Sequence, residues 1–162
     1  MEPDNFSFGV VPVRYTAEGL QMLLGKSARG DHFTIPKGHL DQGEAQIDGA
    51  VRELMEESGH APRLFLTEAF TWTPDKAQAM QLPPLIFDHY SRYLGRQTRK
   101  LVGFFVAQVE YVSEVPDTQE IEYIQWFPAT AAITQVLRYE VDKEHFCNAI
   151  LPVLDRIRDL AN

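Results

Sequence analysis

The sequence is poor in cysteine, with Cys147 as the single one in 162 residues. One cysteine cannot form an intramolecular disulfide, so the disulfide-stapled class of small secreted proteins is excluded. The N-terminal residues 1–5, Met-Glu-Pro-Asp-Asn, also lack the basic and then apolar character of a secretion signal. A cytoplasmic location is therefore expected.

Long apolar runs are missing as well. The longest one, Leu101 to Val109, includes a glycine and one polar residue and falls far short of the roughly 20 residues that span a bilayer. It is predicted to be a buried strand, and no membrane partner is expected.

Positive charge is scarce, because 15 Lys and Arg stand against 23 Asp and Glu and give a formal net charge of -8. Binding to nucleic-acid polymers relies on clustered Lys and Arg, so no such polymer is expected as the main partner. A small phosphorylated molecule remains compatible, since a few well-placed cations can hold its phosphates. The length and a hydrophobic content of 44% predict one domain over residues 1–162, with the oligomeric state left open.

The clearest positive signal is an amphipathic helix that ends near Ser58. Its apolar residues recur at steps of three and four and predict one buried stripe: Ile47, Ala50, Val51 and Leu54. Glu53, Glu56 and Glu57 fall on the opposite side, where like charges three and four residues apart repel one another. A bound cation would remove that repulsion. Oxygen ligands without His or Cys favour Mg2+, with Mn2+ as the alternative ion.

An acidic helix face is most often a solvated surface, but three neighbours favour a metal site here. Arg52 is placed to brace the carboxylates, and Gly59 ends the helix as a C-terminal glycine does. Gly38 is expected at a strand-to-helix turn, where its carbonyl could reach a metal and its missing side chain permits close approach.

Together these residues resemble the Nudix box, G-x5-E-x7-R-E-U-x-E-E-x-G-U with U an aliphatic residue. The matching array begins at Gly38, continues through Glu44 and ends as Arg52-Glu53-Leu54-Met55-Glu56-Glu57-Ser58-Gly59-His60. Every fixed position matches except the last, where His60 replaces an aliphatic residue. This difference is expected to affect only the packing behind the helix end. The resemblance implies an α/β fold, the Nudix-type α/β/α sandwich with a central mixed β-sheet.

The resemblance also implies a metal-dependent hydrolase of phosphoanhydrides. The implied metal ligands are the Gly38 carbonyl and the carboxylates of Glu53, Glu56 and Glu57. The implied catalytic residues are Glu53, Glu57 and Glu120, and the general base is either a box glutamate, Glu57 first, or Glu120. Glu44 and Arg52 are expected to orient the loop and the carboxylates.

Three segments outside the box are similar to asymmetrical diadenosine tetraphosphate hydrolases. They are the loop Pro36–His39, the lysine-led strand Lys100–Ala107, and Glu120 placed six residues before Trp126. The loop also resembles that of diphosphoinositol polyphosphate phosphohydrolases. Two features depart from the tetraphosphate hydrolases: His32 and Phe33 stand where a Trp is usual, and the stretch 74–99 is longer than expected.

The function implied first is asymmetrical cleavage of diadenosine tetraphosphate to ATP and AMP. One alternative is hydrolysis of diphosphoinositol polyphosphates, which should demand a more basic pocket than this chain offers. Another is pyrophosphohydrolysis of nucleoside triphosphates or nucleotide sugars, with RNA-cap hydrolysis a weaker variant because of the net charge. A ligand sensor without turnover is the non-enzymatic alternative, although degenerate sensors are expected to lose box glutamates.

A basic and aromatic segment, 88–100, is the second informative region. It carries Arg92, Arg96, Arg99 and Lys100 close to Phe87, Tyr90 and Tyr93. Such residues could clamp a nucleotide, with cations on the phosphates and a ring stacked on the base, or the rings could simply anchor the segment to the sheet. The residues expected to bind substrate are Lys37, His39, Tyr90, Arg92, Tyr93, Arg96 and Lys100.

The remaining periodicity predicts further elements. Strands are expected over 6–15, 20–25, 64–71, 101–112 and 121–127, with an irregular stretch before the fourth. Helices are expected within 33–58 after a loop, near 130–137, and from Asp142 onward. Asp142 is a suitable N-cap, and Pro152 is expected to kink or restart the last helix.

Overall fold

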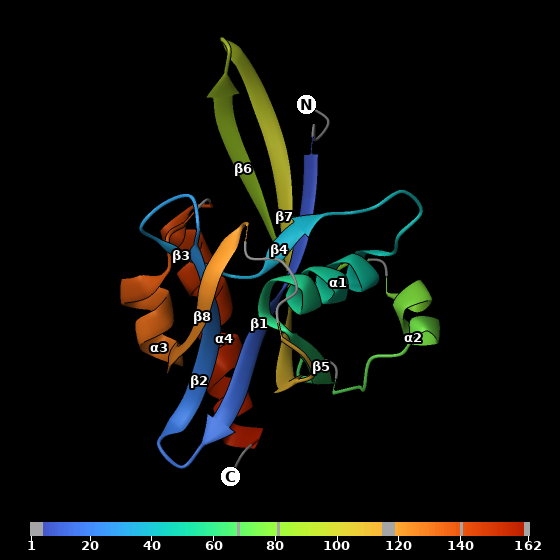
Figure 1. Cartoon of the computed structure of the whole chain (residues 1–162), viewed down its shortest axis with the longest axis vertical. Helices are drawn as coiled ribbons and strands as arrows, with labels where there is room; N and C mark the ends of the chain where they lie inside the picture. The colour runs from blue at the N-terminus through green and yellow to red at the C-terminus, as the bar shows by residue number, and fades with distance from the viewer. Residues whose placement is uncertain (1–4, 68, 81, 115–118, 140, 161–162) are drawn as a thin grey trace.

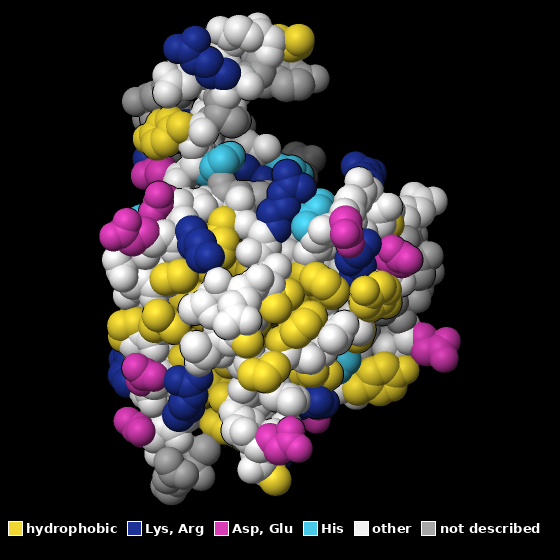
Figure 2. Space-filling model, turned by 90° about the vertical axis from the view of Figure 1, so that its left-hand side faces the viewer, with side chains coloured by type: hydrophobic (Ala, Val, Ile, Leu, Met, Phe, Trp, Pro, Cys, Tyr) yellow, Lys and Arg dark blue, Asp and Glu magenta, His cyan; other side chains and the backbone are white. Residues whose placement is uncertain are grey.

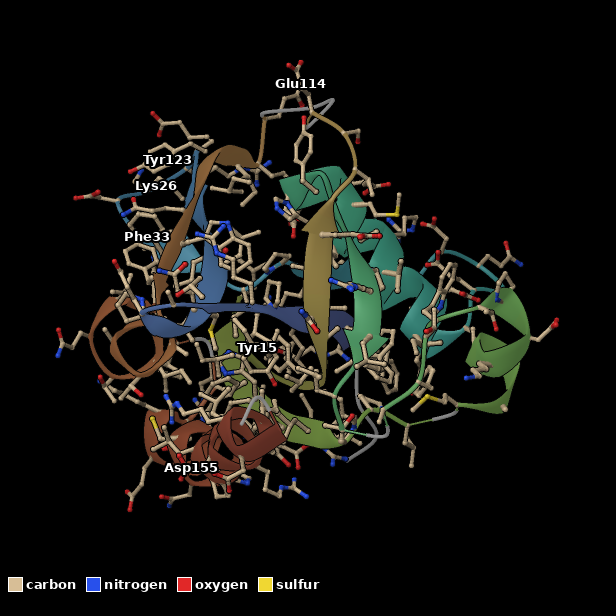
Figure 3. All side chains as sticks on the ribbon, turned by 90° about the horizontal axis from the view of Figure 1, so that it is seen from below. Tyr15, Lys26, Phe33, Glu114, Tyr123 and Asp155 are labelled. Carbon is tan, nitrogen blue, oxygen red and sulfur yellow. The ribbon has the colours of Figure 1, made fainter. Side chains whose placement is uncertain are left out.

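A computed structural model describes residues 5–160 apart from 68, 81, 115–118 and 140. The described strands form one mixed sheet that lies between helices (Figure 1). Helix α1 (Gln46–Ser58) covers one face and helix α4 (Lys143–Leu160) covers the other, as the view from below shows (Figure 3). The predicted α/β/α sandwich with a central mixed sheet is confirmed.

Strand β1 (Asn5–Thr16) lies at the centre of the sheet. It pairs parallel with β7 (Arg96–Tyr111) and antiparallel with β2 (Gly19–Ser27) and β4 (Lys37–His39). The outer strands are β3 (Phe33–Thr34) and β8 (Ile121–Pro128) on β2, and β5 (His60–Phe65) and β6 (Leu85–Tyr93) on β7. A nearly continuous apolar run suits this position, because β1 is buried on both faces.

Alternate residues of β1 supply two separate cores. Val10 packs with the predicted stripe of α1, and all four residues of that stripe are buried. Val11 packs with the buried face of α4, which includes Phe146, Ile150 and Leu154. Successive side chains on a strand point to opposite faces, so one central strand anchors both helices.

The end of α1 is fixed to the far end of β7 through Gly59. This residue has a φ of 65°, and its N–H donates to the Met55 carbonyl at 3.0 Å. Its own carbonyl accepts hydrogen bonds from the N–H groups of Val112 and Ser113, at 2.9 and 3.1 Å. The predicted helix end is confirmed.

His60 fills the position where the box has an aliphatic residue. It is buried, with Nδ1 2.7 Å from the Ser58 carbonyl oxygen. Its ring meets those of Tyr111 and Trp126 edge to face. A flat ring in an aromatic pocket therefore replaces the usual aliphatic contact.

The strand expected over 64–71 is wrong in its limits, since β5 begins at His60 and ends at Phe65. The chain then reverses, because the N–H of Phe65 donates to the Phe70 carbonyl at 2.8 Å and their rings stack. Because Phe65 and Phe70 are both apolar, the sequence pattern wrongly predicted one longer strand.

The stretch expected to be irregular contains two elements. Helix α2 (Pro74–Ala79) starts behind Thr73, whose hydroxyl accepts the Lys76 N–H. Strand β6 forms a hairpin with β7 through Leu94 and Gly95, and β7 starts earlier than the predicted strand. The hairpin projects beyond the rest of the sheet (Figure 1). Its outer half mixes charged, polar and aromatic residues, so hydrophobic periodicity gave little signal there.

The C-terminal elements follow the prediction closely. A short helical segment, α3 (Ala129–Ala131) continued by the π-helical turn η1 (Ala132–Val136), precedes α4. Asp142 accepts the His145 N–H at 2.7 Å as the N-cap of α4. Of the kink or restart expected at Pro152, the restart is wrong, because α4 is one continuous helix. Pro152 lies on its exposed side, where water can reach the backbone carbonyl that the missing N–H leaves unpaired. None of the described helices has the length and apolarity needed to cross a membrane.

Candidate active site

The guanidinium group of Arg52 contacts both the loop that precedes α1 and the carboxylates on α1. Its Nε and Nη2 donate to the two carboxylate oxygens of Glu44 at 2.9 and 3.1 Å. Nη1 reaches Glu53 at 3.0 Å and Glu56 at 3.2 Å, and Nη2 also donates to the His39 carbonyl at 2.9 Å. This fork ties the loop before α1 to the carboxylates on α1.

Glu44 is the carboxylate that Arg52 stabilises in its charged form. The hydrogen bonds from Arg52 hold the pKa of Glu44 below its usual range, and the backbone N–H of Asp41 adds a further bond at 3.0 Å. Glu44 and Arg52 thus form an ion pair, which is consistent with the expectation that they orient the loop and the carboxylates.

Gly38 lies in β4, paired with Phe8 of β1, and not at a strand-to-helix turn as predicted. A Cβ at this position would overlap the carboxylate of Glu53. Glycine at this position leaves room for the end of the Glu53 side chain between β4 and α1, and any larger residue would make that carboxylate move.

Glu57 is the most deeply buried carboxylate of the site. Burial, followed by the nearby charges of Glu53 and Glu120, raises the pKa of Glu57 to about 8. One of its oxygens accepts the backbone N–H of Lys37 at 3.0 Å. Burial also raises the pKa of Glu53, although Arg52 opposes the shift. Negative charge at this end of α1 is thus poorly compensated.

Glu120 reaches the same region from the start of β8. It lines two adjoining hollows with Glu57 and Arg29. The larger, of about 440 Å³, also includes Glu53 and Glu56 in its lining. The smaller, of about 240 Å³, includes Lys37. We call these two hollows the carboxylate cleft. It brings together the helix carboxylates, one glutamate from outside the helix and two cations.

Comparison with known proteins identifies the family, because the NUDIX domain model matches residues 5–148. The chain belongs to the Nudix family. It is 31% identical over 110 residues to the asymmetrical bis(5'-nucleosyl)-tetraphosphatase of Mus musculus, covering 66% of this chain and 63% of that protein. It is 32% identical over 99 residues to the RNA pyrophosphohydrolase of Bartonella clarridgeiae, covering 58% of this chain and 54% of that protein. The chain thus spans less than two thirds of the length of these relatives.

A solved structure agrees on the fold. A C. elegans Ap4A hydrolase binary complex superposes with a TM-score of 0.59 at 20% identity, covering 97% of both chains. At this identity the likeness concerns the Nudix fold alone.

Nudix hydrolases generally use divalent metals, and the donor chemistry of the cleft fits such an ion. Its ligands would be carboxylate oxygens, which hard cations prefer, and a cation would compensate the charge that raises the pKa of Glu57. Within the described residues, however, no three His, Cys, Asp or Glu side chains converge on one point. Glu53 and Glu56 are turned toward Arg52, so both would have to exchange that contact for the ion.

The other residues expected to bind substrate do not all meet at the Nudix cleft. Lys37 lines it, but His39 faces a different groove, with Nδ1 3.1 Å from the Phe6 carbonyl oxygen. The remaining ones lie on the β6–β7 hairpin: Tyr90, Arg92, Tyr93, Arg96 and Lys100. The side chain of Tyr93 lies outside the described part of the chain. Figure 2 shows the hairpin overhanging a hollow edged by Lys, Arg and His side chains, and the nucleotide clamp stays a prediction.

One cleft residue was missed from the sequence. Arg29 lies in the loop between β2 and β3 and lines both hollows of the cleft. Ser27-Ala28-Arg29-Gly30 reads as an ordinary turn, and an isolated arginine beside a glycine carries no distinctive spacing. Only the three-dimensional structure places it opposite Glu57.

Proposed function

We propose that this Nudix protein is a metal-dependent phosphoanhydride hydrolase that cleaves diadenosine tetraphosphate asymmetrically to ATP and AMP. The observation that carries the proposal is the carboxylate cleft, in which the buried Glu57 faces Glu120 beside the cations Arg29 and Lys37. The similarity to the mouse tetraphosphatase supports the choice of substrate.

The ligands proposed for Mg2+, or Mn2+ in its place, are the carboxylates of Glu53, Glu56 and Glu57 with the Gly38 carbonyl. When bound, the ion supplies positive charge for the phosphates and lowers the pKa of water. Arg52 sets the direction from which Glu53 and Glu56 enter the cleft, because it contacts both.

The substrate phosphates are proposed to bind between Arg29 and Lys37. Both residues line the smaller hollow together with Glu57 and Glu120. Two cations in an otherwise acidic cleft orient a polyphosphate and hold its cleaved phosphorus near the carboxylates. Either Glu57 or Glu120 then accepts the proton of the attacking water.

The second candidate function is removal of pyrophosphate from a nucleoside 5'-triphosphate. The similarity to the RNA pyrophosphohydrolase of Bartonella clarridgeiae favours it. Diphosphoinositol polyphosphates fit less well, because four of the residues that line the cleft are glutamates and two are cations.

The test is to incubate the purified protein with Mg2+ and diadenosine tetraphosphate and to resolve the products by ion-exchange chromatography. Equal amounts of ATP and AMP are expected. Two molecules of ADP would contradict the asymmetrical cut. An intact tetraphosphate together with pyrophosphate released from a triphosphate would select the second candidate.

A further inference from the structure

The loop between β2 and β3, which carries Arg29, is held by hydrogen bonds to its own end and to β8. The N–H of Ser27 donates to the His32 carbonyl at 2.9 Å and closes the loop. The N–H of Ala28 donates to the backbone carbonyl of Glu120, also at 2.9 Å. The backbone just before Arg29 is therefore fixed relative to a glutamate that lines the carboxylate cleft.

Lys26 holds the same loop from its other side. Its ammonium group donates to the carbonyl oxygens of Gly30 at 2.9 Å and Ser27 at 3.1 Å, and a carboxylate oxygen of Glu122 lies 3.4 Å away. An ammonium group has three N–H donors, which matches these three partners. The side chain of Lys26 is only 13% exposed. A lysine that is this well shielded and has a partner for each N–H contributes to the loop structure, unlike a solvated surface lysine.

Strand β8 is irregular at the point where it meets Lys26. Lys26 pairs with Tyr123 and Ser27 pairs with Ile121, so Glu122 is the extra residue of a β-bulge. Bulges re-aim side chains and occur often beside active sites. Here the bulged residue is the one whose carboxylate contacts Lys26. Figure 3 shows Lys26 and Tyr123 close together on their neighbouring strands.

Arg29 lies between the two attachments of the loop. Ala28 before it is tied to β8, and Gly30 after it is tied to Lys26. Its own N–H donates to the Ser27 hydroxyl at 3.2 Å. Arg29 lines both hollows of the cleft, whereas Lys26 lines neither. Because the arginine side chain is long and exposed, a fixed backbone limits the positions that its guanidinium group can reach.

We infer that Lys26 is a positioning residue for phosphate binding, which acts through Arg29 without touching the substrate. The inference rests on the proposed function, in which Arg29 and Lys37 bind the phosphates. Without the ammonium group, the carbonyls of Ser27 and Gly30 lose this donor, and the loop gains alternative conformations. Arg29 then reaches the phosphates in only a fraction of the molecules, and the apparent affinity falls by that fraction.

The test is calorimetric titration with Mg2+ and methylenediphosphonate, a pyrophosphate analogue whose P–C–P bridge is not hydrolysed. Arg29→Met should raise the dissociation constant at least about tenfold, because a hydrogen bond to a charged group is lost. Lys26→Met should raise it at least about threefold. The double variant should bind no more weakly than Arg29→Met alone, because Lys26 acts through Arg29.

The matched control is Lys76→Met, which removes the same charge from an exposed position of α2 outside the cleft and should bind like the wild type. Lys26→Gln keeps an N–H donor without the charge and is the milder variant if Lys26→Met does not fold. Hydrogen exchange separates a loosened loop from a weakened fold. It should become faster at the N–H of Ala28 but stay unchanged at Val11 in the centre of β1.

Three outcomes would overturn the inference. One is a Lys26→Met variant that binds the analogue as tightly as the wild type. Another is a double variant in which the two effects multiply, since Lys26 would then act independently of Arg29. The third is a wild type that does not bind methylenediphosphonate. A wild type that binds it but leaves diadenosine tetraphosphate intact would contradict only the proposed substrate, and the double variant would still decide the role of Lys26.

Discussion

Two carboxylates of this chain sit in opposite electrostatic surroundings. Glu44 is held charged by Arg52, and its pKa is lowered. Glu57 is buried beside Glu53 and Glu120, and its pKa rises to about 8. A group with a lowered pKa adds stability above its unfolded value, whereas a group with a raised pKa loses stability as pH rises.

Without metal, the protein is therefore expected to lose stability between pH 4.5 and about 8. In this window the folded state keeps the Glu57 proton and the unfolded state does not. Glu44 is charged in both states above about pH 5.5 and contributes no slope over that part of the window. The slope from Glu57 is at most about 1.4 kcal/mol per pH unit, measurable by urea denaturation in the presence of a chelator.

The control for this pH effect is Glu57→Gln, which keeps the shape but cannot titrate. Its stability should change less with pH than that of the wild type across the same window. A wild-type stability that rises from pH 5 to pH 8 would contradict the assignment of a buried, protonated Glu57.

Gly38 offers a second prediction at the residue scale. Gly38→Ala should destabilise the fold by about 1 kcal/mol, the low end of the cost of overpacking, because the new Cβ overlaps the Glu53 carboxylate, which can move only by giving up its contact with Arg52. In a Glu53→Ala background the same change should cost much less. Thermal denaturation of the four variants gives the coupling, and an equal cost in both backgrounds would show that Glu53 is not the obstacle.

At the residue scale, the sequence predicted site residues where the chemistry depends on a fixed spacing between them. The box positions predicted that Arg52 braces the helix carboxylates, and Glu56 lies four residues after it, where helix periodicity brings side chains together. Arg29 could not be predicted as a cleft residue, because its position in the cleft with Glu57 depends on how the β2–β3 loop folds against β8.

Among the elements, α1 depends on how it ends. Gly59 combines a left-handed backbone with a close approach, since a Cβ there would overlap the Ser113 carbonyl oxygen. The end of α1 is also where Glu56 and Glu57 enter the cleft. A change at Gly59 should therefore disturb both stability and the position of the carboxylates.

Gly59→Ala is expected to cost more than the roughly 1–2 kcal/mol of a left-handed residue alone. Gly59→Asn should be nearly as harmful, because asparagine tolerates the backbone angle but still carries a Cβ. Denaturation midpoints of both variants measure this. An asparagine variant as stable as the wild type would mean that Ser113 moves aside without cost.

The elements that the sequence predicted well were those with a strong period. The stripe of α1 and the apolar run of β1 gave clear signals. Strand β6 did not, because beyond Phe87 its residues alternate between aromatic, polar and charged types with no buried partner face. Its existence follows from pairing with β7 across the Leu94–Gly95 turn, and Leu-Gly lacks the Asn-Gly or Asp-Gly signal of a two-residue hairpin.

At the scale of the whole molecule, the two faces of the sheet have different roles. The core beneath α4 fixes one face, while α1 on the other face carries the box carboxylates toward β8. The overall acidity of the chain was interpreted as compatible with a small phosphorylated ligand, but the net charge of the chain gave no sign of the basic hairpin. The position of the hairpin could not be predicted, since it depends on sheet register.

Metal-dependent hydrolysis in the carboxylate cleft should depend on the carboxylate of Glu57. The most direct measurement is the turnover of diadenosine tetraphosphate with Mg2+ for Glu57→Gln and for Glu110→Gln, an identical change at an exposed position of β7 outside the cleft. Turnover should fall at least about 10²-fold in Glu57→Gln and stay near the wild-type value in Glu110→Gln. Near-wild-type turnover of Glu57→Gln would contradict the proposed metal-dependent hydrolysis in the carboxylate cleft.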